Sequence, residues 1–194
     1  MADKAEVAVI GLIGSGFMGK THAVGFTNVN RVFDLPIEVR LHTLADVNAE
    51  MAAKSATKLG FANATDDWRS LISNPEINLI DITTPNRFHR EMALAAIEAG
   101  KHVYCEKPLA PTAAECLEMT LAAERKGIQT AVGFNYVKNP MIKLAKDIID
   151  SGELGEIRNF RGIHAEDFMA DAATPWSWRL DLAGGGGALA DIGS

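Results

Sequence analysis

The sequence predicts an α/β protein in which a doubly wound parallel sheet is followed by the start of a second domain. Short apolar runs alternate with segments of helical periodicity, which is the pattern of parallel strands joined by crossover helices. A glycine-rich turn follows the first apolar run directly, in the place where such a sheet turns from strand to helix. The predicted strands are Val7–Ile13, Val39–Ala45, Leu79–Thr83, His102–Cys105 and Ile128–Val132.

The composition excludes several classes of protein. Of the 194 residues, 47% are hydrophobic and 23% are charged, which is ordinary for a globular protein. The net charge of -6 disfavours nucleic acid as a partner, because phosphate backbones select basic surfaces. Cys105 and Cys116 are too few for a disulfide framework or a cysteine-based zinc site. The charged amino terminus is unlike a signal peptide, and no apolar stretch reaches spanning length. We therefore expect a cytoplasmic protein with no metal and no membrane partner.

Helix-capping signals lie between the predicted strands. Asn86 is a candidate cap for a helix that ends at Gly100. Thr112 and Glu115 have the spacing of a capping box, and Gly127 is the expected stop of that helix. Each cap lies between two strand candidates, so the helices are predicted to be the crossovers of the sheet.

The pattern changes after Val132, and we place a domain boundary near residue 133. Residues 1–133 are the predicted dinucleotide-binding domain, and residues 134–194 are the predicted beginning of a substrate-binding and oligomerisation domain. In the second part, Asn139-Pro140 predicts the start of a helix that Gly152 closes. Ile157–His164 is predicted to be a strand, although its alternation is imperfect.

The turn after the first strand has the sequence Gly14-Ser15-Gly16-Phe17-Met18-Gly19, which is G-x-G-x-x-G between a strand and a helix. This is the context that the dinucleotide fingerprint requires. Gly14 permits the tight turn, Gly16 lets the backbone approach a diphosphate, and Gly19 permits close packing of helix on strand. The helix N-terminus supplies amides and a partial positive charge for that diphosphate. The alternative is a glycine-rich turn without a ligand.

Asp46 follows the second predicted strand and is a candidate ligand of the adenosine ribose. A carboxylate there accepts hydrogen bonds from both ribose hydroxyls and repels a 2′-phosphate, which favours NAD over NADP. Asp46 lies 32 residues after Gly14, whereas the usual separation is about 20. An insertion that interrupts the helix around residues 28–36 would account for the excess. The alternative role for Asp46 is to cap the next helix.

Polar residues follow the later strands, at the edge where open parallel sheets bind ligands. One strand leads into Thr84-Pro85-Asn86, the next into Glu106-Lys107-Pro108, and the last into Gly133-Phe134-Asn135. We expect Lys107 to project into the same crevice as Gly14 and Asp46. The alternative is that Lys107 is a solvated loop charge.

With these motifs the sequence resembles the Gfo/Idh/MocA family, which includes glucose–fructose oxidoreductase and inositol dehydrogenase. The resemblance covers essentially the whole chain. It rests on the glycine motif, Thr84-Pro85-Asn86 with His89, Glu106-Lys107-Pro108, Gly133-Phe134-Asn135-Tyr136, Trp178-Arg179, Gly184–Gly187 and Asp191-Ile192-Gly193. It implies a Rossmann domain followed by an α+β domain with a mostly antiparallel sheet. It also implies an NAD(P)-dependent homo-oligomer that transfers a hydride to or from a sugar, inositol or related polyol.

The resemblance assigns roles to individual residues. Lys107 corresponds to the catalytic lysine, and Asp191 to the first residue of a second catalytic signature, aspartate-x-x-x-histidine. The candidate cofactor-binding residues are Gly14, Gly16, Phe17, Met18, Gly19, Asp46, Thr84, Pro85, Asn86, His89, Glu106, Asn135, Trp176 and Arg179. For His89 the alternative is an ordinary exposed helix histidine, and for Trp176 and Trp178 it is the core of the second domain.

The histidine of that second signature would be the residue after Ser194, and residues 134–194 hold too few strands for a sheet. We therefore expect this sequence to belong to a longer protein and to be inactive by itself. The alternative function is a non-catalytic regulator that senses a dinucleotide. The triplet around Lys107 argues against it, because a sensor has no need of that lysine. A metal-dependent hydrolase has little support, because the five histidines lack ligand spacing.

Overall fold

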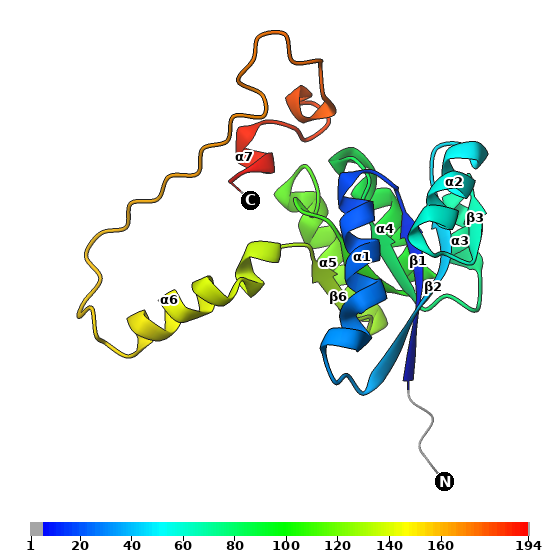
Figure 1. The fold of residues 1–194 in the computed structure, drawn as a ribbon, viewed down its shortest axis with the longest axis horizontal. Coiled ribbons are helices and arrows are strands. Elements are labelled where there is room, and N and C mark those ends of the chain that lie inside the picture. Colours follow the sequence, from blue (N-terminus) through cyan, green and yellow to red (C-terminus); the bar gives the residue numbers. More distant parts are fainter. Residues whose placement is uncertain (1–5, 194) are drawn as a thin grey trace.

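A computed structural model of the chain describes residues 6–193. Its centre is a six-stranded sheet in the order β3-β2-β1-β4-β5-β6, in which every pair of neighbours is parallel (Figure 1). The strands are β1 (Glu6–Ile13), β2 (Ile37–Ala45), β3 (Asn63–Thr65), β4 (Leu79–Ile82), β5 (His102–Cys105) and β6 (Thr130–Val132). This confirms the doubly wound fold, with β3 as a short strand that the sequence analysis lacked. The order reverses between β1 and β4, and such switch points bind ligands.

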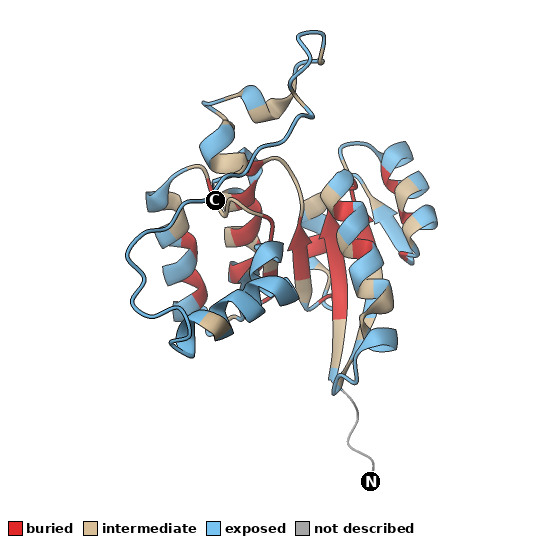
Figure 2. Ribbon diagram, turned by 60° about the vertical axis from the view of Figure 1, so that its left-hand side comes forward, coloured by how far each residue is buried: buried red, intermediate tan, exposed pale blue. Residues whose placement is uncertain are grey.

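Helices cover both faces of the sheet, and burial is greatest in the carboxyl-terminal halves of β1 and β2 and in β4 (Figure 2). The helices are α1 (Phe17–Val32), α2 (Ala49–Leu59), α3 (Trp68–Ser73), α4 (His89–Glu98), α5 (Ala113–Lys126), α6 (Pro140–Asp150) and α7 (Ala188–Asp191). One apolar core joins the sheet to α3, α4 and α5, and the other joins it to α1 and α2. Residues of alternating orientation on β1 supply both cores, because successive side chains of a strand point to opposite faces.

Most predicted caps are present. The Thr112 hydroxyl accepts a hydrogen bond from the Glu115 amide, and the Glu115 carboxylate accepts one from the Thr112 amide, which completes the capping box of α5. The Asn139 side chain accepts a hydrogen bond from the second residue of α6. Asn86 is different, because it lies in a 3-10 turn that precedes α4 and its side chain caps nothing. The predicted Asn86 cap is therefore wrong.

The predicted interruption of the first helix near Asn28 is also wrong. Helix α1 runs unbroken for 16 residues to Val32. The Asn30 side chain donates to the carbonyl of Ile37 at 2.6 Å and accepts from the amide of Val39 at 2.9 Å. These bonds tie the last turn of α1 to the start of β2. The long separation of Gly14 and Asp46 thus comes from a long helix, a short connection and the nine residues of β2.

The predicted strand over Ile157–His164 is not formed. Residues 157–164 have no regular secondary structure, and all of them are exposed. An isolated strand leaves its backbone amides and carbonyls without partners from a neighbouring strand. Within residues 6–193 every strand belongs to the one parallel sheet, so an antiparallel sheet in a second domain remains a prediction. Among these described residues, no helix has the length and apolar character needed to cross a membrane.

Candidate active site at the carboxyl ends of the strands

The glycine-rich turn between β1 and α1 is open where a ligand would approach it. Gly14 has a φ of 99°, and its amide donates to the carbonyl of Ala45 at 2.9 Å. A Cβ on Gly19 would overlap the Gly14 carbonyl and lie 2.9 Å from Oγ1 of Thr83. A Cβ on Gly16, by contrast, would meet no atom within 4 Å. Gly14 is therefore required by its backbone conformation and Gly19 by close packing, whereas the backbone at Gly16 is left accessible.

The first turn of α1 has the properties of a diphosphate site. Gly16 occupies the N-cap position and has no side chain that could bond the first amides of the helix. Phe17 is 77% exposed and Met18 is half-buried. Free amides and the helix dipole favour an anion at such a terminus. The residues present therefore fit the diphosphate of a dinucleotide.

Asp46 lies against the glycine-rich turn. Its Oδ2 atom accepts hydrogen bonds from the amide of Ser15, at 2.8 Å, and from the Ser15 hydroxyl. Its Oδ1 atom accepts from the amide of Val47 at 2.7 Å. The cap of α2 is Asn48, whose side chain accepts from the Met51 amide. The alternative role of Asp46 as a helix cap is therefore wrong, and its carboxylate is fixed beside the predicted diphosphate site.

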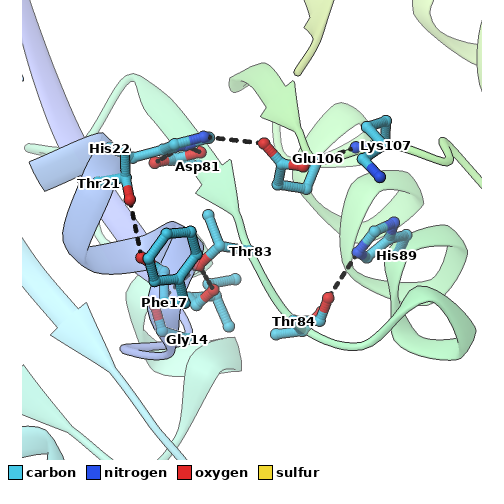
Figure 3. A network of polar contacts seen from close by, with 11 residues as sticks. Gly14, Phe17, Thr21, His22, Asp81, Thr83, Thr84, His89, Glu106 and Lys107 are labelled. Atoms are coloured by element: carbon cyan, nitrogen blue, oxygen red, sulfur yellow. Dashed lines mark hydrogen bonds and ion pairs between the residues drawn. The ribbon is translucent and has the colours of Figure 1, made fainter. Parts of the chain in front are cut away.

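A buried charged cluster, which the sequence analysis missed, lies between α1 and the ends of β4 and β5 (Figure 3). It consists of His22, Asp81 and Glu106, and we call it the His22 cluster. The Nδ1 atom of His22 lies 3.0 Å from both carboxylate oxygens of Asp81. The Nε2 atom lies 3.0 Å from Oε1 of Glu106. Burial alone would lower the pKa of His22, but the hydrogen bonds and charges of the two carboxylates raise it to about 9.

Aromatic rings pack against the His22 ring of the cluster. The Tyr104 ring stacks on the His22 ring, with 4.8 Å between centroids and 9° between planes. Phe26 packs edge-on against both rings. Burial raises the pKa of Asp81, while its bonds to His22 oppose that shift. Because both carboxylate oxygens of Asp81 face the same ring nitrogen, the geometry favours a carboxylate paired with an imidazolium.

Glu106 connects the His22 cluster to Lys107. The Glu106 amide donates to the carbonyl of Ile82 at 2.9 Å, which continues the β4–β5 pairing. Its Oε2 atom accepts from the amide of Lys107 at 3.1 Å. A Cβ on Gly133, just after β6, would lie 2.9 Å from Cδ of Glu106. Gly133 thus leaves the space that the Glu106 side chain occupies.

The two predicted catalytic residues lie together. The Nζ atom of Lys107 contacts the Asp191 carbonyl oxygen and lies 3.4 Å from Oδ1 of Asp191. The Nε atom of Arg179 lies 3.1 Å from Oδ2 of the same carboxylate. The guanidinium of Arg179 also lies 4.7 Å above the ring of Trp178. The structure therefore brings Lys107, Asp191 and Arg179 into one partly exposed group.

His89 is fully buried, and its ring is used within the protein. Its Nε2 atom lies 2.8 Å from the Thr84 carbonyl oxygen, and its Nδ1 atom lies 2.9 Å from that of Pro108. Burial lowers the pKa of His89, and the two carbonyls oppose that shift. The alternative of an exposed helix histidine is wrong. Direct cofactor contact through a ring nitrogen does not fit this geometry either, so His89 instead joins the segments after β4 and β5.

The remaining predicted residues are dispersed. Asn86 is buried, and its amide donates to the carbonyl of Gly185 at 2.7 Å. Thr84 and Pro85 are half-buried beside it. Asn135 is exposed, and Trp176 is 71% exposed, so Trp176 is no core residue in this structure. Within residues 6–193, no cluster of histidine, cysteine and carboxylate side chains is suited to hold a metal ion.

Known proteins match both the sequence and the fold. A family model described as an oxidoreductase family with an NAD-binding Rossmann fold matches residues 8–134. The chain belongs to the Gfo/Idh/MocA family. A model of the GFO/IDH/MocA C-terminal domain matches residues 142–194.

Characterised Gfo/Idh/MocA proteins are similar over most of the chain. Levoglucosan dehydrogenase of Pseudarthrobacter phenanthrenivorans is 45% identical over 188 residues, which are 94% of this chain and 47% of that protein. Inositol 2-dehydrogenase of Pseudomonas fluorescens is 34% identical over 76% of this chain and 43% of that protein. The chain thus spans about half the length of the curated relatives it matches.

Solved structures of the same family share the fold. A levoglucosan dehydrogenase in complex with NADH and levoglucosan has a TM-score of 0.93 and 44% identity, over 97% of this chain and 51% of that one. An NAD binding oxidoreductase from Klebsiella pneumoniae has a TM-score of 0.89 and 48% identity, over 98% of this chain and 51% of that one.

Proposed function

We propose that this protein is an NAD-dependent dehydrogenase that transfers a hydride between the nicotinamide and a sugar, inositol or related polyol. The contact between Lys107 and Asp191 carries the proposal, because it places an ammonium group at the edge of the sheet where ligands bind. The 45% identity with levoglucosan dehydrogenase supports a sugar-like substrate. We also propose that residues 1–133 bind the cofactor and that residues 134–194 contribute to the substrate site and to a homo-oligomer, in the cytoplasm.

The cofactor would accept or donate the hydride, and side chains of this chain would orient the substrate and stabilise the charge that develops on it. The Lys107 ammonium orients the substrate oxygen and stabilises the negative charge that develops on it. Asp191 holds the ammonium on one side, and the Glu106 carboxylate holds the Lys107 backbone on the other. A positioned acid–base group is typically worth about 10²- to 10⁴-fold in rate.

The first turn of α1 and Asp46 would hold the adenosine half of the dinucleotide. The carboxylate of Asp46 disfavours the 2′-phosphate of NADP by charge repulsion. For the nicotinamide half we propose the residues at the ends of β4, β5 and β6 together with the segment before α7. These are Thr84, Pro85, Asn86, Glu106, Asn135, Trp176 and Arg179.

The test is an activity screen of the complete protein. NAD and a panel containing levoglucosan, glucose, other pyranoses and inositols are incubated with the enzyme, and NADH formation is followed by absorbance. We expect turnover with at least one cyclic polyol and a lower rate with NADP. NADH binding without turnover on any member of the panel would favour the non-catalytic regulator instead.

A further inference from the structure

The His22 cluster joins the dinucleotide-binding helix to the segment that carries Lys107. Of its three residues, His22 belongs to α1, Asp81 to β4, and Glu106 to the end of β5. The side chains of His22 and Glu106 are each 7% exposed and that of Asp81 is fully buried. We propose that protonated His22 is a positioning residue that holds the Glu106 carboxylate and, through it, the backbone of Lys107 in the reactive place. The inference rests on the proposed catalytic role of Lys107.

The geometry favours a protonated ring. A neutral imidazole has one N–H donor, whereas an imidazolium has two. Each ring nitrogen of His22 lies 3.0 Å from a carboxyl oxygen of Asp81 or Glu106, and an ionised carboxylate can only accept. A neutral ring would leave one carboxylate facing a nitrogen lone pair in a buried site, and that arrangement is costly. The imidazolium satisfies both carboxylates at once.

The connection to Lys107 passes through one carboxyl group. Oε1 of Glu106 faces His22, and Oε2 accepts from the amide of Lys107. If His22 loses its charge, Glu106 faces Asp81 without a cation between them, and like charges in a buried site repel. The Glu106 side chain would then shift, and the Lys107 amide would lose its partner. A displacement of about 1 Å in a reacting group can cost about 100-fold in rate.

The surroundings of His22 contain several other titratable groups. Tyr104 stacks on the ring, and burial followed by the charges of Asp81 and Glu106 raises the pKa of its phenol. The buried thiol of Cys105 and the ring of His89 lie within the electrostatic influence of Glu106. None of these groups brings a cation into contact with the carboxylates, because the two ring nitrogens of His89 face the carbonyl oxygens of Thr84 and Pro108. His22 is thus the cation that matches Asp81 and Glu106 in this part of the structure.

A hollow of about 450 Å³ adjoins His22 and gives a way to test the inference chemically. Its lining includes Thr21, Gly25 and Phe26 around the His22 ring. In the complete enzyme, His22→Ala should lower kcat by about 10- to 100-fold, with the Kd for NADH changed less than about threefold. Added imidazole should enter the space and restore part of kcat. His22→Gln, which offers one donor, should keep intermediate activity.

Controls separate this inference from the proposed function. His42→Ala removes a histidine whose Nε2 lies 3.2 Å from the exposed Glu76, so it should leave kcat unchanged. If Lys107→Ala abolishes turnover and both His22 variants keep wild-type kcat, the positioning role is wrong and the proposed function stands. If Lys107→Ala keeps wild-type kcat, the catalytic role of Lys107 is wrong and the positioning role of His22 falls with it, whereas the proposed function is wrong only if the wild type binds NADH and turns over no member of the panel.

A measurement on the wild-type protein is independent of both activity and variant folding. Ring ¹⁵N shifts in NMR spectra report whether each imidazole nitrogen carries a proton. We expect both nitrogens of His22 to be protonated at neutral pH and to titrate with a midpoint near the pKa of about 9. A ring that is neutral at pH 8 would overturn the inference, whatever the variants show.

Discussion

The Nζ atom of Lys107 lies 3.4 Å from Oδ1 of Asp191, a residue 84 positions further along the chain. The two side chains are 26% and 23% exposed, so the pair is open to a small molecule on one side. An ion pair in this setting is a weak source of stability, because water screens it. Its importance is geometric, because it fixes the direction of the ammonium group that we propose to contact the substrate.

Replacing Lys107 with alanine should lower the rate of catalysis and leave cofactor binding nearly unchanged. We expect kcat of the complete enzyme to fall by about 10²- to 10⁴-fold, because the ammonium faces Asp191 and not the glycine-rich turn. The Kd for NADH, measured by fluorescence titration, should stay nearly constant. Lys54→Ala, at an exposed position on α2, is the matched control. A Lys107→Ala enzyme that retains more than about a tenth of kcat would exclude the catalytic role.

Asp46 should set the preference for NADH over NADPH. In Asp46→Ser the repulsion of the 2′-phosphate is lost, so the ratio of the two Kd values should move towards one. Binding of NADH itself should weaken, because serine offers one acceptor where the carboxylate offers two. Asp66→Ser removes an exposed carboxylate that follows the neighbouring strand β3 and should leave the ratio unchanged. Equal binding of the two cofactors by the wild type would remove Asp46 from this role.

Two glycines of α1 should respond oppositely to alanine. In Gly19→Ala the new methyl group would overlap the Gly14 carbonyl, so we expect unfolding free energy to fall by about 1 to 3 kcal/mol and NADH binding to weaken. In Gly25→Ala the methyl group meets no atom within 4 Å. Helix propensity should then raise stability by about 1 kcal/mol. Denaturant titration of both variants measures the contrast, and equal effects would contradict it.

The His22 cluster should make stability depend on pH in the alkaline range. The folded-state pKa of His22, about 9, lies above its ordinary value of 6.5. Its contribution is therefore complete below about pH 6.5 and is lost as the pH rises through about 9. That loss is on the order of 3 kcal/mol. Unfolding free energies measured across this range should fall for the wild type and stay flatter for His22→Gln. Parallel curves would show that His22 is not charged in the folded state.

Local patterns predicted most of the fold. The five strands that were proposed for residues 1–133 form, and the capping box at Thr112 and Glu115 is present, because both depend on neighbours in sequence. The short strand β3 has three polar or small residues and gives no periodic signal. The strand expected over residues 157–164 failed for a different reason, since its apolar residues could not reveal whether a pairing strand exists.

The candidate site was predicted less completely. The glycine-rich turn was expected, and Lys107 and Asp191 were expected as site residues through family resemblance, but the contact between these two was not. The His22 cluster was missed because its contacts join residues 59 and 84 positions apart. The sequence did contain one indication of this cluster. Asp81 interrupts the otherwise apolar strand Leu79-Ile80-Asp81-Ile82, and a fully buried carboxylate requires a partner.

Helix α1 carries the proposed diphosphate site on its first turn and contacts Glu106 through His22 on its second turn. From Gly19 to His22 the helix rises only about 4.5 Å, so the two tasks share one rigid body. Any movement of that helix would also move the His22 ring that contacts Glu106. If the dinucleotide binds at the first turn as we propose, its site and the backbone of Lys107 are linked through one helix and one carboxylate.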